Sequence, residues 1–193
     1  MADPANTSPA DTSPADNAFT FESAASKTYP LCPEGIQRVI VDKALFEMRD
    51  NFQKTAKVPT ISLWLSTLDA KYKDETSGED RSYRLFKTMK VSDHEKSTMH
   101  EFFQRVMGTP VPLRETAAAD GTVAKRIYIG PRTVETVEDG EDKVHYPAFE
   151  NLEFIITVAH KKLDDGRTKD GVDSVVACNP EQKGLNAKLF ATE

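Results

Sequence analysis

Cysteine and histidine are scarce in this chain of 193 residues. The two cysteines, Cys32 and Cys178, do not form a CxxC motif and are too few for the disulfide framework of a small secreted domain. The closest pair among the four histidines, His94 and His100, is six residues apart. Because a zinc site draws several ligands from closer spacings on a helix or hairpin, we expect no metal and no cofactor.

Long apolar runs are missing too. The longest aliphatic stretch, at 155–159, is far shorter than the roughly 18–20 apolar residues of a membrane-spanning helix. The first residues lack the basic start and the apolar segment of a signal peptide. The sequence therefore predicts a cytoplasmic protein with no membrane partner.

The signatures of common catalytic sites are also absent, including GxxxxGK[ST], GxGxxG, GxSxG and HExxH. Acidic residues do cluster at 135–142 and at Asp164-Asp165, and a metal-dependent nuclease needs carboxylates that converge on Mg²⁺. Both clusters lie in turns that contain glycine, where exposed charge is common. We expect no enzymatic activity, with such a nuclease as an alternative.

Positive charge is outnumbered, since 25 Lys and Arg face 31 Asp and Glu for a net charge of −6. The excess is local: residues 1–28 hold four acids against one lysine, and residues 135–153 hold seven acids against one lysine. The stretch 81–107 holds six Lys and Arg against three acids. The acidic total therefore does not exclude a nucleic-acid partner, which needs cations only where the phosphates lie.

Residues 1–28 differ from the rest of the chain. The run TSPAD at 7–11 is repeated directly at 12–16, and aliphatic residues are almost absent before Leu31. Such a segment buries too little apolar surface to offset its ordering entropy, so we predict a disordered N-terminal tail. The domain is expected at 29–180, followed by a C-terminal tail at 181–193 that is either a frayed helix or free.

Strands dominate the first half of this domain. The composition predicts them at 36–48, 60–72 and 82–91, and turn residues separate them. Alternation is clearest in the second, where Ile61, Leu63 and Leu65 share one face and Trp64 lies on the other.

One helix follows. Ser92 and Glu95 fit the S-x-x-E capping box, and an apolar stripe then runs along one helix face. That stripe consists of Met99, Phe102, Phe103 and Val106. Gly108 and Pro110 end the helix near Met107.

Residues 109–150 are the least regular, and we read them as an insertion. Segments 123–129 and 132–137 are expected to form a β-ribbon, with 143–146 as a returning strand. Two further strands are predicted at 152–162 and 171–177. The order β-β-β-α-β-β matches a five-stranded OB-fold barrel with an inserted ribbon. A two-sheet sandwich is the alternative, although it normally has seven or more strands.

The candidate site follows from the alternation. If Ile61 and Leu63 point inward, Trp64 points outward, and the matching face of the third strand carries Arg84, Phe86 and Lys90. Flat rings and cations are what single-stranded nucleic acid requires for stacking and for phosphate contacts. In the alternative, the N-terminal segment or the 109–150 ribbon covers Trp64, and a shift of one residue, which exchanges the two faces, places Phe86 in the core.

We therefore select a set of nucleic-acid-binding candidates centred on these strands. They are Trp64, Phe86, Arg84, Lys87, Lys90, Lys71, Lys73, Lys43, Phe46, Arg126 and Tyr128.

Three segments resemble a group of small bacteriophage proteins. These are the turn Tyr29–Gly35 before the first strand, Val91–Ser97 before the helix, and Phe154–His160 with the Gly166-Arg167 turn and Val172–Pro180 after it. The chain is similar there to phage OB-fold single-stranded DNA-binding proteins. The resemblance implies sequence-tolerant binding of single-stranded DNA in phage replication or recombination. It implies the host cytoplasm, with replication or recombination proteins or a second copy of the chain as possible partners. A non-catalytic β-barrel interaction module of a phage is the alternative function.

Overall fold

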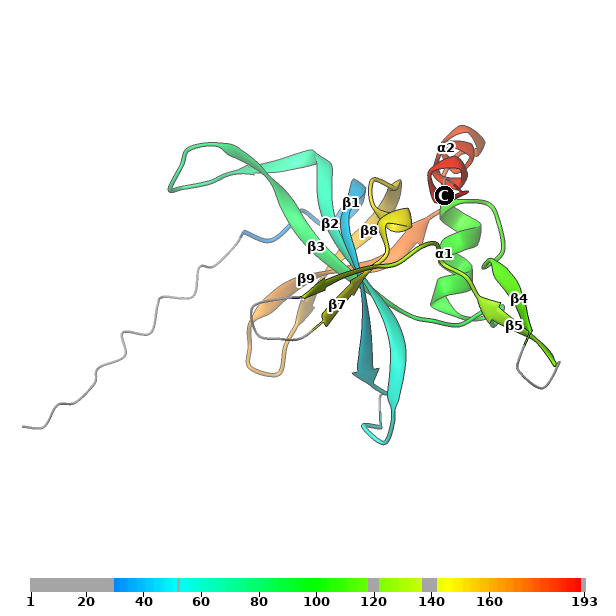
Figure 1. Cartoon of the computed structure of the whole chain (residues 1–193). Helices are drawn as coiled ribbons and strands as arrows, with labels where there is room; N and C mark the ends of the chain where they lie inside the picture. Colours follow the sequence, from blue (N-terminus) through cyan, green and yellow to red (C-terminus); the bar gives the residue numbers. More distant parts are fainter. Residues whose placement is uncertain (1–29, 52, 118–121, 137–141, 192–193) are drawn as a thin grey trace, which may run out of the picture.

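The computed structural model describes residues 30–51, 53–117, 122–136 and 142–191, and the following statements concern these residues. The chain is mainly β with antiparallel pairing, as predicted, but it contains two α-helices (Figure 1). The elements in order are β1 (Gly35–Asp50), β2 (Lys57–Lys73), β3 (Asp80–Lys90), α1 (Thr98–Val106), β4 (Leu113–Ala117), β5 (Val123–Ile127), β6 (Thr133–Thr136), β7 (Asp142–His145), the 3-10 turn η1 (Pro147–Phe149), β8 (Glu153–Lys162), β9 (Thr168–Val176) and α2 (Pro180–Ala191).

Strand β1 is central to the main sheet because it is long enough to pair with three other strands. One edge pairs with β2 from Val39 to Asp50. The other edge pairs first with β8, over 35–40, and then with β7 at Leu45 and Phe46. A bulge between Val41 and Lys43 separates these two halves, and bulges of this kind increase the local bend of a strand.

The predicted closed barrel is not present in the part of the chain that the structure describes. Pairing runs from β3 through β2, β1 and β8 to β9, and all of these neighbours are antiparallel. Strands β3 and β9 approach each other, but no backbone ladder joins them. The sheet is therefore curved and open along one seam, which we call the β3–β9 gap (Figure 1).

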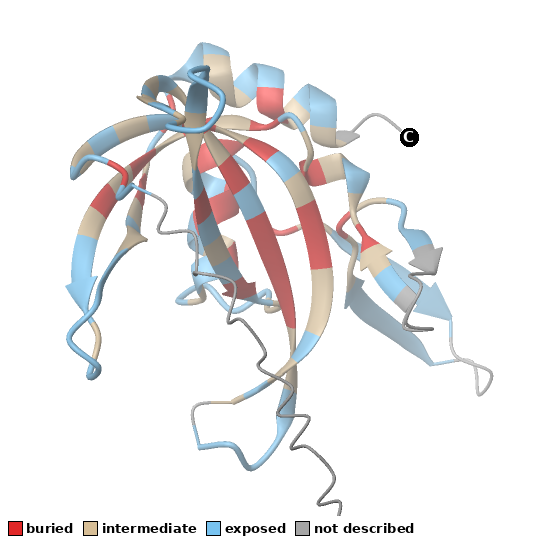
Figure 2. Cartoon of the chain, turned by 90° about the vertical axis from the view of Figure 1, so that its left-hand side faces the viewer, coloured by how far each residue is buried: buried red, intermediate tan, exposed pale blue. Residues whose placement is uncertain are grey.

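Helix α1 carries the apolar stripe that the sequence predicts. Met99, Phe102, Phe103 and Val106 are all buried, and Phe102 packs edge-on against Phe154 of β8 with ring centroids 5.3 Å apart. Buried positions alternate with more accessible ones along β8 and from Leu63 to Thr67 of β2, as half-buried strands require, whereas residues 60–63 of β2 are all buried (Figure 2). Gly108 has a φ of 71°, the left-handed conformation that ends a helix.

The start of α1 differs from the prediction. Ser97, not Ser92, is the N-cap, and its Oγ accepts a hydrogen bond of 3.1 Å from the His100 N–H. The Ser92 Oγ accepts a hydrogen bond of 3.2 Å from the His94 N–H. Ser92 therefore stabilises a local turn at residues 92–94, before the helix begins. The capping-box pattern therefore marked the turn that precedes the helix rather than the helix itself.

Replacing Ser97 with alanine should lower the free energy of unfolding by about 1 kcal/mol, because one first-turn N–H loses its partner. Chemical denaturation measures this loss. Ser92→Ala is the matched control and should change stability by less than half as much. Equal losses in the two variants would contradict Ser97 as the cap.

The C-terminal segment is a packed helix, which corrects the prediction of a tail at 181–193. Asn186 is fully buried, and its Nδ2 donates to the backbone oxygens of Val106 and Glu153 at 3.1 and 2.8 Å. Phe190 lies edge-on to Phe103 and Phe149, with ring centroids 5.2 Å away in each case. Helix α2 therefore docks beside α1 and β8 (Figure 1).

The region 109–150 pairs differently from the prediction. Strand β5 pairs with β4 in a separate two-stranded sheet, so the expected ribbon between 123–129 and 132–137 is wrong. Strand β6 pairs with β7, and β7 joins the edge of β1. The predicted return of the chain at 143–146 is confirmed by β7. The predicted tail at 1–28 lies outside the described residues.

Candidate nucleic-acid interface

Trp64 and Phe86 form an exposed aromatic pair on the outer face of the sheet. They are cross-strand partners on β2 and β3, and their ring centroids lie 5.3 Å apart at an interplanar angle of 70°. Trp64 is 45% exposed and Phe86 38% exposed, whereas Ile61, Leu63 and Leu65 are buried. The predicted register is confirmed, and the alternative that places Phe86 in the core is wrong.

Strand β1 contributes an arginine that the sequence argument missed. The Arg49 Cζ lies 5.1 Å from the centre of the Phe86 ring, a cation–π distance. Glu47 Oε2 holds this guanidinium at 2.6 Å and also accepts a hydrogen bond of 2.9 Å from Ser62 Oγ. A chain of contacts thus runs from Ser62 through Glu47 to Arg49 and holds the guanidinium over the Phe86 ring. The sequence predicts the end of this strand at residue 48, whereas β1 continues to Asp50 and includes Arg49.

Cations flank the aromatic pair on β3. Arg84 and Lys90 share the outward face with Phe86, since residues two apart on a strand lie on one face. Both side chains are exposed, and neither forms an ion pair within the described ranges. Lys43 completes a row across three strands, because it lies opposite Trp64, which lies opposite Phe86. We call Lys43, Arg49, Trp64, Arg84, Phe86 and Lys90 the outer face.

Lys87 does not belong to this face. It lies opposite Leu63, on the side of the buried Leu85 and Met89. Burial lowers the pKa of its ammonium group, while the nearby carboxylates Glu101 and Asp173 act in the opposite direction. The alternation along β3 places Lys87 on the inward face, away from Phe86, although its residue type suits a phosphate contact.

Phe46 also faces the other way. It lies opposite the buried Ile61 and packs edge-on against Tyr146 with ring centroids 6.2 Å apart. Cross-strand partners share a face, so Phe46 is on the core side of β1. It therefore supports the packing of β1 against the segment after β7 and is not available for base stacking.

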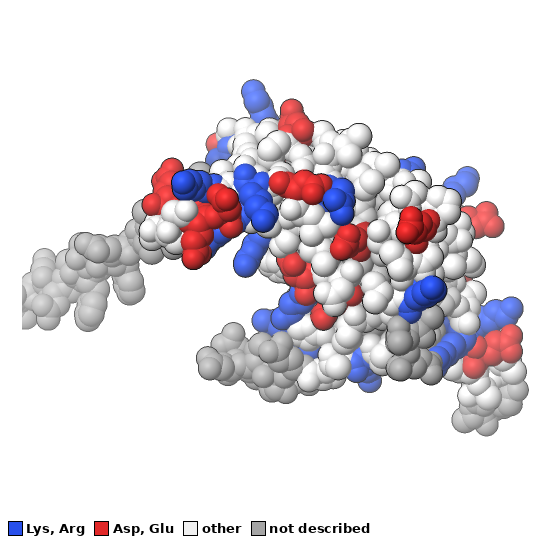
Figure 3. Space-filling model, turned by 90° about the horizontal axis from the view of Figure 1, so that it is seen from above, with Lys and Arg blue, Asp and Glu red and all other residues white. Residues whose placement is uncertain are grey.

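Lys71 and Lys73 lie further along β2, on the arm that it forms with β3. A register shift between Ser66 and Lys71 separates this arm from the outer face. Both lysines are exposed, but the arm also carries acids, and Arg81 pairs with Asp74 at 3.2 Å. Acidic and basic side chains are mixed at the left of the view from above (Figure 3). The arm is therefore not a purely basic surface.

Arg126 and Tyr128 lie in or next to the separate β4–β5 sheet. Arg126 lies opposite Arg114, whose Cζ sits 3.4 Å from the centre of the Tyr128 ring. No ladder connects this hairpin to β2 or β3 in the described parts of the chain. The two residues form a cluster of their own and do not extend the outer face.

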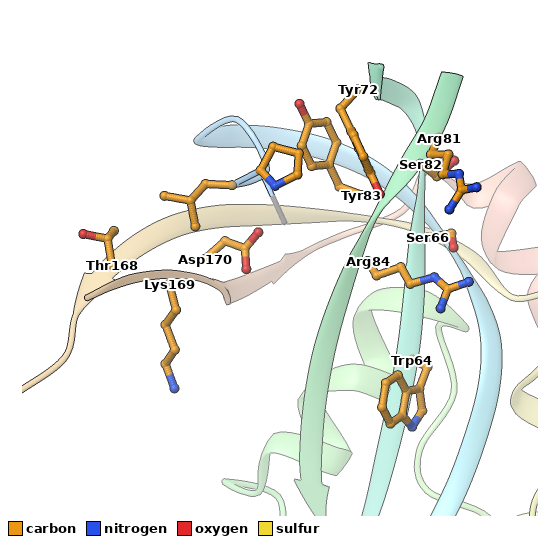
Figure 4. Close-up of a pocket in the computed structure, with 12 residues that line it drawn as sticks. Trp64, Ser66, Tyr72, Arg81, Ser82, Tyr83, Arg84, Thr168, Lys169 and Asp170 are labelled. Carbon is orange, nitrogen blue, oxygen red and sulfur yellow. The ribbon is translucent and has the colours of Figure 1, made fainter. Parts of the chain in front are cut away.

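A cavity of about 730 Å³ opens at the β3–β9 gap, next to the outer face. Figure 4 shows Tyr72 and Tyr83 together at one end, Trp64 at the other, and β9 across from them. Its lining comprises Pro30, Leu31, Trp64, Ser66, Tyr72, Arg81, Ser82, Tyr83, Arg84, Thr168, Lys169 and Asp170. No sequence pattern pointed to it, because its walls meet only when β9 folds back beside β3.

The described residues contain no group of three or more His, Cys, Asp and Glu side chains arranged to hold a metal ion. Among the same residues, neither helix has the length and apolar character to cross a membrane.

Comparison with known proteins adds no relative. No protein family, no curated protein and no solved structure matches this chain. The functional argument therefore depends on the geometry described above.

Proposed function

We propose that this protein binds single-stranded DNA without sequence preference, through the outer face of an OB-type barrel that is open between β3 and β9. The strand order supports this barrel, because β1 pairs with β2 and β8, β3 pairs with β2, and β9 pairs with β8. The helix between the third strand and the next strand of the main sheet agrees with the same architecture. A fold alone does not determine function, so the proposal depends on the chemistry of the side chains on the outer face.

The observation that carries it is the exposed Trp64–Phe86 pair flanked by cations. An outward tryptophan beside a phenylalanine presents flat apolar surface to solvent on the two strands at one edge of the sheet. Stacking of one base on such a ring contributes roughly 1–3 kcal/mol and tolerates every base. Arg84 and Lys90 flank the pair and supply positive charge for phosphates, while Arg49, paired with Glu47, lies over the Phe86 ring.

This function is non-catalytic and requires no cofactor. It fits a role in phage DNA replication or recombination in the host cytoplasm, with replication or recombination proteins as further partners. A structural module of a phage is the alternative, and it predicts no salt-sensitive affinity for oligonucleotides.

Trp64 is the only tryptophan, so its fluorescence reports on this face alone. Titration with a dT oligomer at low salt should quench the emission, and added salt should reverse the quenching because counterions compete for the phosphates. Arg84→Gln should reduce the slope of log affinity against log salt by about 0.7, the value for one phosphate contact to a single strand.

Lys162→Gln is the matched control for Arg84→Gln, since Lys162 is an exposed cation at the end of β8. Its slope should equal that of the wild type. Unchanged tryptophan emission together with no mobility shift of the oligomer would overturn the proposed function.

A further inference from the structure

The cavity at the β3–β9 gap continues directly from the outer face. Trp64 and Arg84 belong to both, so a strand that stacks on Trp64 is already at its mouth. Its volume of about 730 Å³ lies within the range of small-molecule sites, roughly 300–1,000 Å³. A cavity of this volume is large enough for one nucleotide of a bound DNA strand.

The far end of the cavity holds a second aromatic pair. Tyr72 and Tyr83 are half-buried, and their ring centroids lie 5.1 Å apart at an angle of 50°. The register shift between Ser66 and Lys71 creates this pair, because it sets Tyr72 opposite Arg81 and on the side of Tyr83. The bulge thus moves an aromatic residue of β2 from the outer face to the cavity.

The charges of the lining are arranged unevenly. Arg84 and Lys169 lie on opposite walls, on β3 and β9, and both are exposed. Asp170 lies further in, where its Oδ2 accepts a hydrogen bond of 2.9 Å from the Cys32 N–H. Burial, followed by the charge of Asp170, raises the pKa of the Cys32 thiol to about 11, so this thiol stays neutral. At the inner end, Arg81 lies opposite Tyr72, but Asp74 pairs with it at 3.2 Å. Arg84 and Lys169 therefore favour phosphate at the mouth, and Asp170 favours an uncharged base inside.

We infer that this cavity is a second nucleotide subsite, which receives a base of the same DNA strand that stacks on Trp64. The base lies against Tyr72 and Tyr83, and Arg84 and Lys169 attract the phosphates on either side of it at the mouth of the cavity. The strand therefore leaves the outer face by crossing the free edge of β3 into the β3–β9 gap. This inference depends on the proposed function, because it concerns a further contact of the same ligand.

The test compares short and long oligomers on the full-length protein. A dT oligomer of about 4 nucleotides occupies the outer face, and one of about 16 nucleotides also reaches the cavity. Tyr72→Leu keeps apolar volume but removes the ring. It should weaken binding of the long oligomer about five- to hundred-fold and leave the short one unchanged. Thermal unfolding confirms that the variant is folded.

A second variant examines the opposite wall. Lys169→Gln should also weaken the long oligomer selectively, whereas Lys162→Gln should not, because Lys162 is not among the residues that line the cavity. Long-oligomer affinities equal to wild type in both Tyr72→Leu and Lys169→Gln would overturn the subsite. In that case normal quenching of Trp64 by the short oligomer would leave the proposed function intact. A wild-type protein that binds neither oligomer would overturn both.

Discussion

Replacing Trp64 with alanine should weaken binding of a dT oligomer about 5- to 150-fold, with little change in the free energy of unfolding. The affinity falls because one base loses a stacking surface worth about 1–3 kcal/mol. Stability is nearly unchanged because the side chain is 45% exposed and its main neighbour is the equally accessible Phe86. Anisotropy of a labelled oligomer measures the affinity, since this variant has lost its only tryptophan.

Two further variants separate stacking from general apolar surface. Trp64→Phe keeps a flat ring and should retain most of the affinity. Ile36→Ala removes a side chain of β1 that is 72% exposed and pairs away from the outer face, so its affinity should equal that of the wild type. A Trp64→Ala protein that unfolds, or that binds as tightly as the wild type, would contradict a stacking role for this residue.

Replacing Phe103 with alanine should lower the free energy of unfolding by about 3–5 kcal/mol. Phe103 is fully buried at the junction of α1, η1 and α2, where it contacts Phe102, Phe149 and Phe190 edge-on. Its removal leaves a cavity bordered by three other rings, which cannot all move inward together. For a chain of this size the midpoint of thermal unfolding should fall by about 6–20 °C.

Leu185→Ala provides the contrast for this measurement. Leu185 is an apolar residue of α2 that is 51% exposed, so its loss should change stability by no more than about 0.5 kcal/mol. Similar losses in Phe103→Ala and Leu185→Ala would contradict the position of the aromatic cluster between the two helices.

Most of the main sheet was predictable because its strands have one buried face. The alternation around Leu63 and Trp64 determined both the strand and its orientation, since a shift of one residue would bury tryptophan and expose leucine. The apolar stripe of α1 was equally clear. The first turn of α1 was not, because Ser92 and Ser97 are both good capping residues, and the structure uses Ser97 for the helix and Ser92 for the turn before it.

The residues of the candidate site also differ in how far the sequence predicts their positions. Trp64, Phe86, Arg84 and Lys90 come together as alternation predicts. Lys87 and Phe46 were assigned by residue type, and the period of two places both on the core side. Arg49 was missed because its contact with Phe86 spans two strands, and sequence separation carries no information on such a pair.

Local patterns determined which residues of this protein form strands, which face of β2 and β3 is buried, and hence which aromatic side chains are exposed. These properties depend on neighbours one to four positions apart. Only the tertiary structure decided that α2 docks through Asn186 and Phe190, that β5 pairs with β4, and that β3 and β9 meet without a ladder. Each of these requires contacts between segments far apart in the chain, where many pairings satisfy the same local pattern and packing selects one of them.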